Sequence, residues 1–490
     1  MWAAHPVVYE VNTWVWLAEL SSREQRRVGL ADVTAEDWDA LCRPGITAVW
    51  LMGVWERSPV AASIFRADPH ASAEYRSLLP DYVDDDVVGS AYAIRQWRVD
   101  PRLGGEAGLV AARAQLAQRG CGLMLDYVPN HVAPDHPWLA DHPERFVRGT
   151  PDDLLADPAA FLSVDGSIVA RGRDPFFPPW PDVAQLDLSA ATTRQAAIDV
   201  LRMIGEHADA VRCDMAMLAL TDVFARTWGS RPPSTPVAEY WDEVIGEVHR
   251  SHPELRFVAE AYWGTEPTLL QQGFDACYDK ELYDHLVASN AAAVHAHVAG
   301  DHANRCEQVR FIENHDEPRA AATFGPDAQR AAAIVVATLP GITLWHDGQF
   351  DARRSRLPVT LGRRPAEADD IELRTWYALL LAGAARIRRG AWQAVATTGW
   401  PDNGSHQNLV AWSWDSPASH ALVLVNLSDT AAQARAHPRW ADLAEGSVTL
   451  ADVLTGERFE RDVDDIATNG LYVDLPPWGS HVLEVRTEVR

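Results

Sequence analysis

The segment Phe257-Val-Ala-Glu-Ala-Tyr262 is an apolar run that ends in charged and hydrogen-bonding residues, and three other segments share this form. They are Asp126-Tyr-Val-Pro-Asn-His131, Val211-Arg-Cys-Asp-Met-Ala216 and Phe311-Ile-Glu-Asn-His-Asp316. A short continuous apolar run predicts a strand that is buried on both faces. Polar residues that follow such strands gather at the carboxyl end of a parallel barrel. The four segments therefore predict a parallel α/β fold with one polar site.

Further apolar runs complete a set of eight expected strands. They span residues 7–14, 46–52, 122–128, 210–213, 256–259, 276–278, 308–312 and 342–345. Helices are expected between the strands, for example at 35–42, where Thr34 can act as the N-cap, and at 237–251. Strands that alternate with helices in this way predict an α/β fold built on a parallel (β/α)₈ TIM barrel.

Two long interruptions and a change of pattern divide the chain into expected domains. Residues 54–97 are expected to form a long loop after the second strand. Residues 132–187 are rich in Pro, Asp and aromatic residues, and an insertion of that length after the third strand predicts a small domain. Short strands later in the chain predict a C-terminal antiparallel β-sandwich over 393–490. The barrel would then comprise 1–131 and 188–392.

The composition excludes several classes of partner. The chain has 490 residues, too many for one compact core, and it is 47% hydrophobic and 23% charged, as in ordinary globular proteins. Its formal net charge of -26 argues against nucleic acid and anionic membranes, because both require a basic face. A neutral substrate such as a sugar is compatible with this charge. The sequence does not indicate an oligomeric state.

The N-terminus and the cysteines indicate a reducing compartment. The first residues, Met1-Trp-Ala-Ala-His-Pro6, show no basic segment followed by an apolar one, so no signal peptide is expected. No apolar run is long enough to span a bilayer. The five cysteines form no Cys-x-x-Cys pair, and Cys121 and Cys213 fall in expected strands as reduced core residues. The expected location is cytoplasmic.

The four segments resemble, in order and spacing, those of the α-amylase family of glycoside hydrolases and transglycosidases. The shared pattern is Asp-x-x-x-Asn-His, Arg-x-Asp, Glu and Asn-His-Asp, and the resemblance runs from Val8 to about residue 350. Trp180-Pro-Asp-Val-Ala-Gln-Leu-Asp187 resembles a further motif near the end of the inserted domain. Gly341-Ile-Thr-Leu-Trp-His-Asp-Gly-Gln349 resembles the last barrel strand and the loop after it. The resemblance implies the same three-part fold and action on α-glucosidic bonds.

Three carboxylates carry the expected chemistry. A retaining glycosidase needs a nucleophile and a general acid/base whose carboxyl groups lie about 5–5.5 Å apart. Asp214 is the expected nucleophile, Glu260 the general acid/base, and Asp316 the residue that grips the sugar hydroxyls. Arg212 lies on the same face of its strand as Asp214, so it is expected to hold Asp214 ionised and oriented. The alternative roles are an Arg212–Asp214 pair that closes the barrel end and a helix cap for Glu260.

Four more residues are expected to contact or orient the substrate. The resemblance implies that His131 and His315 hydrogen-bond the sugar at the cleaved bond and that Tyr92 stacks on the same sugar. A core role remains the alternative for Tyr92. Asp126 is expected to orient the site through Arg212 or the backbone rather than to touch the reacting atoms. Together with Arg212 these residues form the predicted substrate-binding set.

One departure from the family pattern bears on metal binding. Family α-amylases often follow the nucleophile with a Lys-His pair, and Met217 and Leu218 occupy those positions here. That weakens the expectation of an endo-acting starch hydrolase and of the usual calcium site, although backbone carbonyls could still bind calcium. No metal ligand and no cofactor are therefore expected. Ala133-Pro-Asp-His-Pro-Trp138 resembles a segment of the maltosyltransferase branch of the family.

The expected function is retaining hydrolysis of α-glucosidic bonds in oligosaccharides or α-glucans through a covalent glycosyl-enzyme intermediate. The first alternative is a glucosyl- or maltosyltransferase of intracellular α-glucan metabolism, because the same three carboxylates serve both reactions. A phosphorylase is a further alternative. A catalytically silent glucan-binding barrel is disfavoured, because Asp214, Glu260 and Asp316 are all present.

Overall fold

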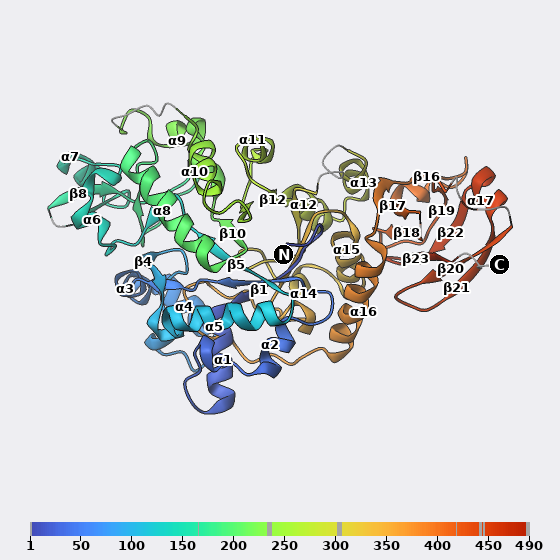
Figure 1. The fold of residues 1–490 in the computed structure, drawn as a ribbon, viewed down its shortest axis with the longest axis horizontal. Helices are drawn as coiled ribbons and strands as arrows, with labels where there is room; N and C mark the ends of the chain where they lie inside the picture. The colour runs from blue at the N-terminus through green and yellow to red at the C-terminus, as the bar shows by residue number, and fades with distance from the viewer. Residues whose placement is uncertain are drawn as a thin grey trace.

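The computed structural model describes residues 2–164, 166–232, 238–300, 306–417, 419–440, 443 and 446–486. A closed parallel barrel lies at the centre of the larger part of the molecule, with the strand order β1-β14-β13-β12-β11-β10-β5-β2 (Figure 1). Its strands are β1 (Val7–Asn12), β2 (Ala48–Met52), β5 (Gly122–Tyr127), β10 (Ala210–Cys213), β11 (Arg256–Ala259), β12 (Ala276–Tyr278), β13 (Gln308–Arg310) and β14 (Ile342–His346). Each predicted strand is confirmed, with differences confined to its ends.

The first strand ends earlier than predicted. The side chain of Asn12 accepts a hydrogen bond from the backbone N–H of Val15, which makes Asn12 the N-cap of a helix. Trp14 therefore belongs to that helix and not to β1, so the predicted end of the strand was wrong. Thr34 caps the next helix as predicted, since its side chain accepts from the N–H of Asp37.

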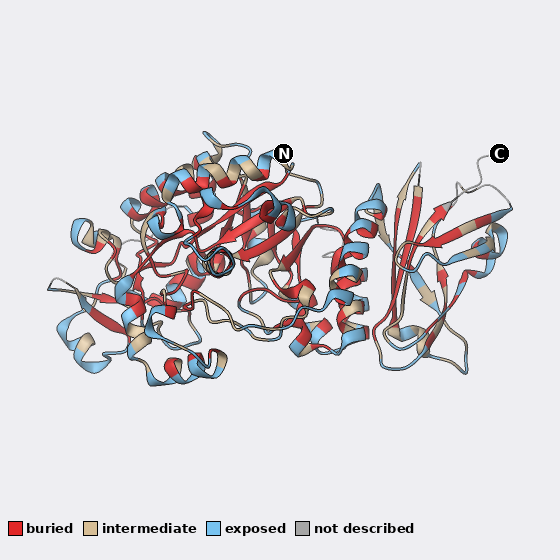
Figure 2. Ribbon diagram, turned by 90° about the horizontal axis from the view of Figure 1, so that it is seen from below, coloured by how far each residue is buried: buried red, intermediate tan, exposed pale blue. Residues whose placement is uncertain are grey.

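Helices surround the barrel and bury one face against it, which Figure 2 shows as buried strands inside helices whose outer faces are exposed. They are α1 (Thr13–Glu24), α2 (Ala35–Leu41), α5 (Gly105–Gln118), α8 (Ala191–His207), α9 (Thr221–Trp228), α10 (Tyr240–His249), α11 (Glu266–Gln271), α12 (Lys280–Val287), α13 (Ala291–Ala299), α14 (Ala320–Thr323), α15 (Pro326–Thr338) and α16 (Ile371–Ile387). The predicted helix at 237–251 is α10, with residue 237 outside the described residues. None of the described helices is long and apolar enough to cross a membrane.

Residues 54–97 are not the long loop that the sequence predicted. They form β3 (Trp55–Arg57), α3 (Pro59–Ala67), α4 (Pro69–Leu78) and the start of β4 (Ile94–Val99), and β3 pairs with β4. Ser58 and Asp68 cap the two helices, and each is followed by a proline at the first helical position. A polar cap followed by proline is a helix start signal, which the loop prediction overlooked.

The insertion between β5 and α8 has secondary structure of its own. It holds β6 (His131–Val132), α6 (Trp138–Asp141), α7 (Pro151–Ala156), β7 (Phe161–Val164), β8 (Ser167–Ala170) and β9 (Ala184–Gln185). The strands β6 and β9 pair at its base, where the side-chain amides of Asn130 and Gln185 exchange two hydrogen bonds of 2.9 and 3.2 Å. The small inserted domain after the third barrel strand is therefore present, and its boundaries at 132–187 stay a prediction.

Antiparallel sheets form the C-terminal β-sandwich. One has the order β15-β17-β18-β23-β20-β21 and the other β16-β19-β22. Their strands are β15 (Ala391–Ala394), β16 (Ala396–Thr398), β17 (Leu409–Ser416), β18 (Ser419–Asn426), β19 (Ala432–His437), β20 (Ser447–Asp452), β21 (Arg458–Asp462), β22 (Leu471–Leu475) and β23 (Ser480–Arg486), and α17 (Val463–Asn469) adjoins them. The sandwich lies against α15 and α16 of the barrel (Figure 1).

One hydrogen bond links the two parts at the end of α15. The indole N–H of buried Trp414 donates to the carbonyl oxygen of Thr338 over 2.8 Å. Thr338 is the last residue of α15, so its carbonyl has no partner within the helix. Trp412 lies two residues away and is equally buried, but its indole N–H meets no hydrogen-bond partner in the described part of the chain.

Replacing Trp414 with Phe is expected to lower the free energy of unfolding by about 1–3 kcal/mol, because the Thr338 carbonyl then stays buried without a donor. Trp412→Phe is the matched control and is expected to cost less. Urea unfolding followed by circular dichroism measures both variants. Equal losses would show that ring packing and not the hydrogen bond stabilises this contact.

Candidate active site

The parallel ladder brings the first two predicted carboxylates together. In the register between β10 and β11, Cys213 lies opposite Ala259. The backbone N–H of Glu260 donates to the carbonyl of Cys213 over 3.0 Å, and that of Asp214 donates to Tyr127 over 2.9 Å. Both residues therefore stand at the carboxyl ends of adjacent strands, one step apart around the rim.

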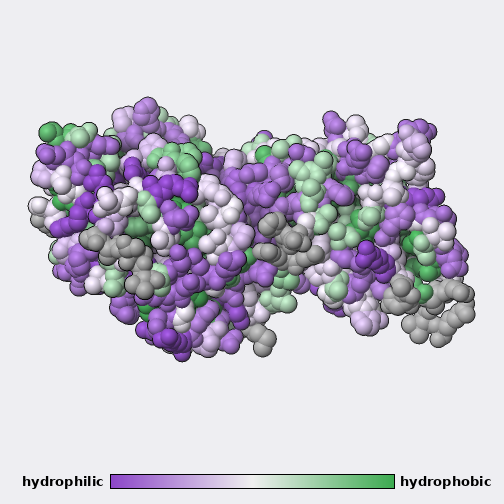
Figure 3. Space-filling view, turned by 90° about the horizontal axis from the view of Figure 1, so that it is seen from above, coloured by the Kyte–Doolittle hydropathy of each residue, from purple (hydrophilic) through white to green (hydrophobic). Residues whose placement is uncertain are grey.

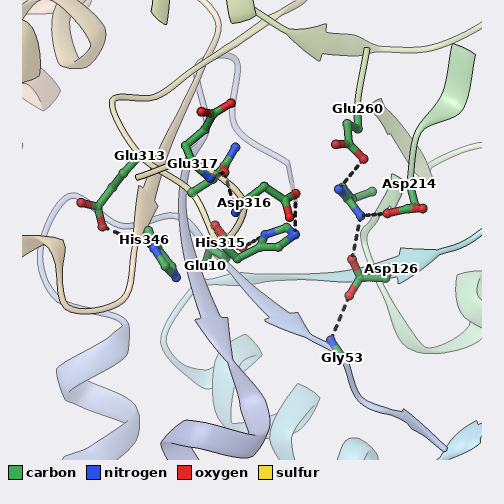
Figure 4. Close-up of polar contacts among 12 residues, drawn as sticks. Glu10, Gly53, Asp126, Asp214, Glu260, Glu313, His315, Asp316, Glu317 and His346 are labelled. Carbon is green, nitrogen blue, oxygen red and sulfur yellow. Dashed lines mark hydrogen bonds and ion pairs between the residues drawn. The ribbon is translucent and has the colours of Figure 1, made fainter. Parts of the chain in front are cut away.

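Arg212 connects these carboxylates. Its side chain is fully buried, with one terminal nitrogen 2.8 Å from an oxygen of Asp214 and the other 2.6 Å from an oxygen of Glu260. An oxygen of Asp126 lies 3.7 Å from the first of these nitrogens. Figure 4 shows the three carboxylates converging on this point. One rigid guanidinium thus sets the spacing of Asp214 and Glu260.

The pKa of Asp214 lies above the usual value for an aspartate. Burial raises the pKa of Asp214 to about 7, and the opposing attraction of Arg212 does not offset it. The neighbouring Glu260 and Asp316 carboxylates add to the rise. Arg212 therefore contacts Asp214 and favours its ionised form, as expected, but burial and the two neighbouring carboxylates outweigh this effect on the pKa.

Two further donors fix the Glu260 side chain. Its Oε2 accepts from the backbone N–H of Met215 over 2.8 Å, and its Oε1 accepts from the hydroxyl of Tyr262 over 2.7 Å. Met215 has a φ of 41°, in the left-handed region that residues with a side chain seldom adopt. The strained turn after β10 thus points an N–H at Glu260, which is 3% exposed.

Asp316 belongs to a second charged group on the other side of the site. His315 lies between Asp316, 3.0 Å from its Nε2, and Glu10, which contacts its Nδ1 (Figure 4). Burial disfavours a charged imidazole, but these two carboxylates raise the pKa of His315 well above its usual value. The imidazolium in turn outweighs the effect of burial on Asp316 and lowers the pKa of that carboxyl. His315 is thus a cation held between two anions.

Sequence reasoning missed Glu10. It is fully buried in β1, within the run Val7-Val-Tyr-Glu-Val11. A single carboxylate inside an apolar strand was the signal, because a buried charge requires a partner. Its partner, His315, is more than 300 positions away along the chain, so the pairing could not be read locally.

The other predicted site residues occupy distinct places. Tyr92 stacks against His315 with ring centroids 5.4 Å apart, and its hydroxyl lies 2.6 Å from Nε2 of that residue. His131 is buried, and burial lowers its pKa to about 3, so the ring is neutral. An oxygen of Asp126 accepts from the backbone N–H of Gly53 over 3.0 Å. Asp126 is therefore held beneath Arg212 and connects β5 with β2.

A cavity of about 410 Å³ opens between these groups. Five of the predicted residues line it: Tyr92, His131, Asp214, Glu260 and Asp316. The lining also includes residues that were not predicted as site residues: Phe65, Ser90, Trp180, Asp182, Val183, Met215, Tyr262, Val359 and Thr360. The size is within the range of small-molecule sites. Most of the added residues come from the segments after β2, β5 and β14.

Asp182 is a fourth carboxylate in the cavity wall. It follows Trp180, whose ring lies 5.2 Å from that of His131. Burial raises the pKa of Asp182 to about 6. The motif at 180–187 contains this residue, but no pattern in it indicates that Asp182 faces the cavity.

Exposed aromatic rings lie on the rim beside Glu260. Trp263, three residues after Glu260, is 43% exposed and has a φ of 64°. Its ring meets that of Phe176 edge to face at 4.8 Å, and Phe177 is also exposed. The carboxylate of Asp174 accepts from the N–H groups of Phe176 and Phe177 and so holds these rings in place. The face of the molecule in Figure 3 is mainly hydrophilic, with small scattered apolar groups.

Across the described residues, no group of three or more His, Cys, Asp or Glu side chains is arranged to hold a metal ion. Met217 and Leu218, at the positions discussed for calcium, are buried apolar residues. The expectation that the chain has no metal ligand stays a prediction.

Sequence comparisons find enzymes of α-glucan chemistry. No protein-family model matches the chain. The α-1,4-glucan:maltose-1-phosphate maltosyltransferase of Rhodospirillum rubrum is 25% identical over 407 residues, 76% of this chain and 53% of that protein. The α-amylase MalA of Haloarcula japonica is 23% identical over 366 residues, 72% of this chain and 45% of that protein. The chain spans about half the length of these curated relatives.

Solved structures share the whole fold. The maltogenic α-amylase AmyB of Thermotoga neapolitana superposes with a TM-score of 0.68 at 17% identity, over 98% of this chain and 99% of that one. The α-amylase of Geobacillus thermoleovorans, solved with acarbose, gives a TM-score of 0.67 at 16% identity over 100% of both chains. Likeness at these identities shows the fold, a barrel with an inserted domain and a β-sandwich. The chain therefore shares its fold with solved α-amylases, and its sequence relatives are α-amylases and maltosyltransferases.

Proposed function

We propose that the chain is a retaining glycosidase that cleaves α-glucosidic bonds of oligosaccharides or α-glucans by double displacement. The observation that carries the proposal is the contact of one guanidinium, Arg212, with both Asp214 and Glu260, which line one cavity. Two carboxyls that share one guanidinium lie close together, as retention requires, whereas inversion needs space for a water molecule between them. The activities of the relatives named above support the substrate class.

In the first half of the reaction, the carboxylate of Asp214 attacks the anomeric carbon while Glu260 gives its proton to the leaving oxygen. A glycosyl ester on Asp214 and a Glu260 carboxylate result. In the second half, Glu260 takes a proton from water or from an acceptor hydroxyl, whose oxygen displaces Asp214 with retention. Arg212 faces one negative carboxylate in each half, first Asp214 and then Glu260. Its charge therefore remains balanced throughout.

Asp316 and His315 bind the sugar in this proposal. The ionised Asp316 accepts hydrogen bonds from sugar hydroxyls, and the His315 cation holds it in place from behind. Such contacts strengthen as the ring flattens toward the oxocarbenium-like transition state. Tyr92 offers the apolar face of its ring at the same position.

Transglycosylation is the second candidate, and one observation favours it. The exposed rings of Trp263 and Phe176 stand beside Glu260, on the side from which an acceptor must approach. Aromatic rings stack on the apolar faces of sugars, so this rim can hold an acceptor sugar against water.

Asp214→Asn is expected to abolish turnover, and Glu260→Gln to lower kcat by about 10²–10⁴-fold, the usual contribution of a general acid/base. Azide attacks without a general base. It is therefore expected to restore turnover of an activated aryl α-glucoside by Glu260→Gln and to leave Asp214→Asn inactive. Chromatography of the glycosyl azide measures this, and equal rescue of both variants would reject the assigned roles.

The pH profile reports the charge of Asp214, which attacks only as a carboxylate. Because its pKa is raised to about 7, kcat/KM is expected to fall as the pH drops through about 7. Below that point the decrease is about tenfold per pH unit, since only the deprotonated fraction reacts. Initial rates on maltooligosaccharides between acidic and alkaline pH test this. An acid limb near the ordinary aspartate pKa of about 3.9 would contradict it.

Trp263→Ala is expected to lower the ratio of transfer products to hydrolysis products, because the acceptor loses its stacking surface. Tyr472→Ala in the β-sandwich is the control, since Tyr472 is also 43% exposed but lies on β22. A proton NMR time course on maltooligosaccharides distinguishes longer oligomers from free α-anomeric sugar. An unchanged ratio in Trp263→Ala would remove the case for an acceptor site at this rim.

A further inference from the structure

A segment that follows β14 forms part of the cavity wall. Residues 352–364, here called the strap, run from the end of β14 toward α16. Val359 and Thr360 of the strap line the same cavity as Asp214 and Glu260. Leu361, the next residue, is fully buried. The strap thus contributes part of the wall of the site at Val359 and Thr360.

Main-chain pairing fixes the strap to the segment that follows α4. The N–H of Val88 donates to the carbonyl of Thr360 over 2.9 Å, and the N–H of Gly362 donates to that of Asp86 over 2.8 Å. Val87 and Leu361 lie opposite each other as an antiparallel bridge. These bonds hold the two wall residues at a defined depth.

Buried side chains add to this anchoring. The hydroxyls of Tyr75 and Thr360 lie 2.7 Å apart, and both residues are buried. The guanidinium of Arg57, 1% exposed, donates to the carbonyls of Val359 and Gly89 over 3.0 and 2.7 Å. Unpairing a buried guanidinium is costly, so Arg57 strongly favours the docked strap.

A surface ion pair completes the attachment. The Arg363 guanidinium contacts both oxygens of Asp86 at 2.6 and 2.8 Å and reaches Asp81 at 3.0 Å. Bidentate pairs of this kind are more specific in geometry than a single contact. The strap is therefore held at its wall residues and directly after them.

The barrel order places the strap relative to the chemistry. The strap leaves β14 and binds the segment that follows β2, so it passes over the rim at β1, which lies between those strands. In the closed ring, β11 is the fourth strand from β1 in either direction. Glu260 follows β11 directly. The strap and the proposed proton donor therefore stand on opposite sides of the barrel mouth.

We propose that the strap closes the glycone end of the cavity, so that the enzyme acts only at the non-reducing ends of its substrates. This inference rests on the proposed function, in which Glu260 protonates the leaving group. The leaving group must then depart on the β11 side, past Trp263 and Phe176. The glycone extends the other way, toward Phe65, Val359 and Thr360. A chain that continued beyond a short terminal unit would meet the strap.

The test compares two aryl maltooligosaccharides of the same length, one free and one carrying an ethylidene group on its non-reducing glucose. The free substrate is expected to be processed, and the blocked one about a hundredfold more slowly, within the range that a shaped pocket achieves. Mass spectrometry of product lengths measures both hydrolysis and transfer. Equal rates on the two substrates would overturn the role of the strap. No turnover of either would overturn the proposed function instead.

A double variant links the selectivity to the strap. Val359→Gly/Thr360→Ser trims the side chains that line the cavity but keeps the hydroxyl that contacts Tyr75, and it is expected to raise the rate on the blocked substrate at least severalfold relative to the free one. Ser355→Gly is the control, because Ser355 lies on the strap but is not among the described residues that line the cavity. Thermal unfolding verifies that both variants fold. An unchanged rate ratio in the double variant would show that another wall blocks the chain and would reject the inference.

Discussion

The buried guanidinium of Arg212 is the interaction on which the rest of the site depends. A charge removed from water is stable only when it is paired and hydrogen-bonded. Here Asp214, Glu260 and Asp126 surround it, and the rings of Trp50 and Tyr92 lie 5.3 and 5.1 Å from its centre. These partners come from widely separated segments of the chain. The packing of the barrel mouth and the spacing of its reactive groups are therefore one arrangement.

The charged residues of the site form two groups, and the carboxyl pKa is raised in one and lowered in the other. Around Arg212 the carboxyls outnumber the cation, and Asp214 is left with a pKa near neutrality. Around His315 a cation lies between two carboxylates, so Asp316 remains ionised. Environments that move the pKa values of nearby acids apart allow one to react and another to bind. In this barrel Asp214 contacts Arg212, whereas Asp316 contacts His315.

Local sequence patterns were sufficient to predict the barrel, but they could not predict the contacts between residues far apart in the chain. Arg256–Ala259 matched its prediction because the run is apolar and bounded by polar residues. The motif residues also meet at one mouth as predicted. The loop prediction for 54–97 failed, since it weighed length above capping signals. The bond between Tyr75 and Thr360 joins residues 285 positions apart, and no local pattern specifies such a pairing. The same limit concealed Glu10.

The strap combines attachment and lining within a few consecutive residues. Leu361 and Arg363 hold the segment, while Val359 and Thr360 face the cavity. Substitutions at Val359 change the shape of the pocket without removing an anchor, because Val359 is held through its main-chain carbonyl, whereas Thr360 is also held through its hydroxyl. Selection can therefore explore new substrate lengths at this wall with little loss of stability, which makes the strap a place where related enzymes can diverge.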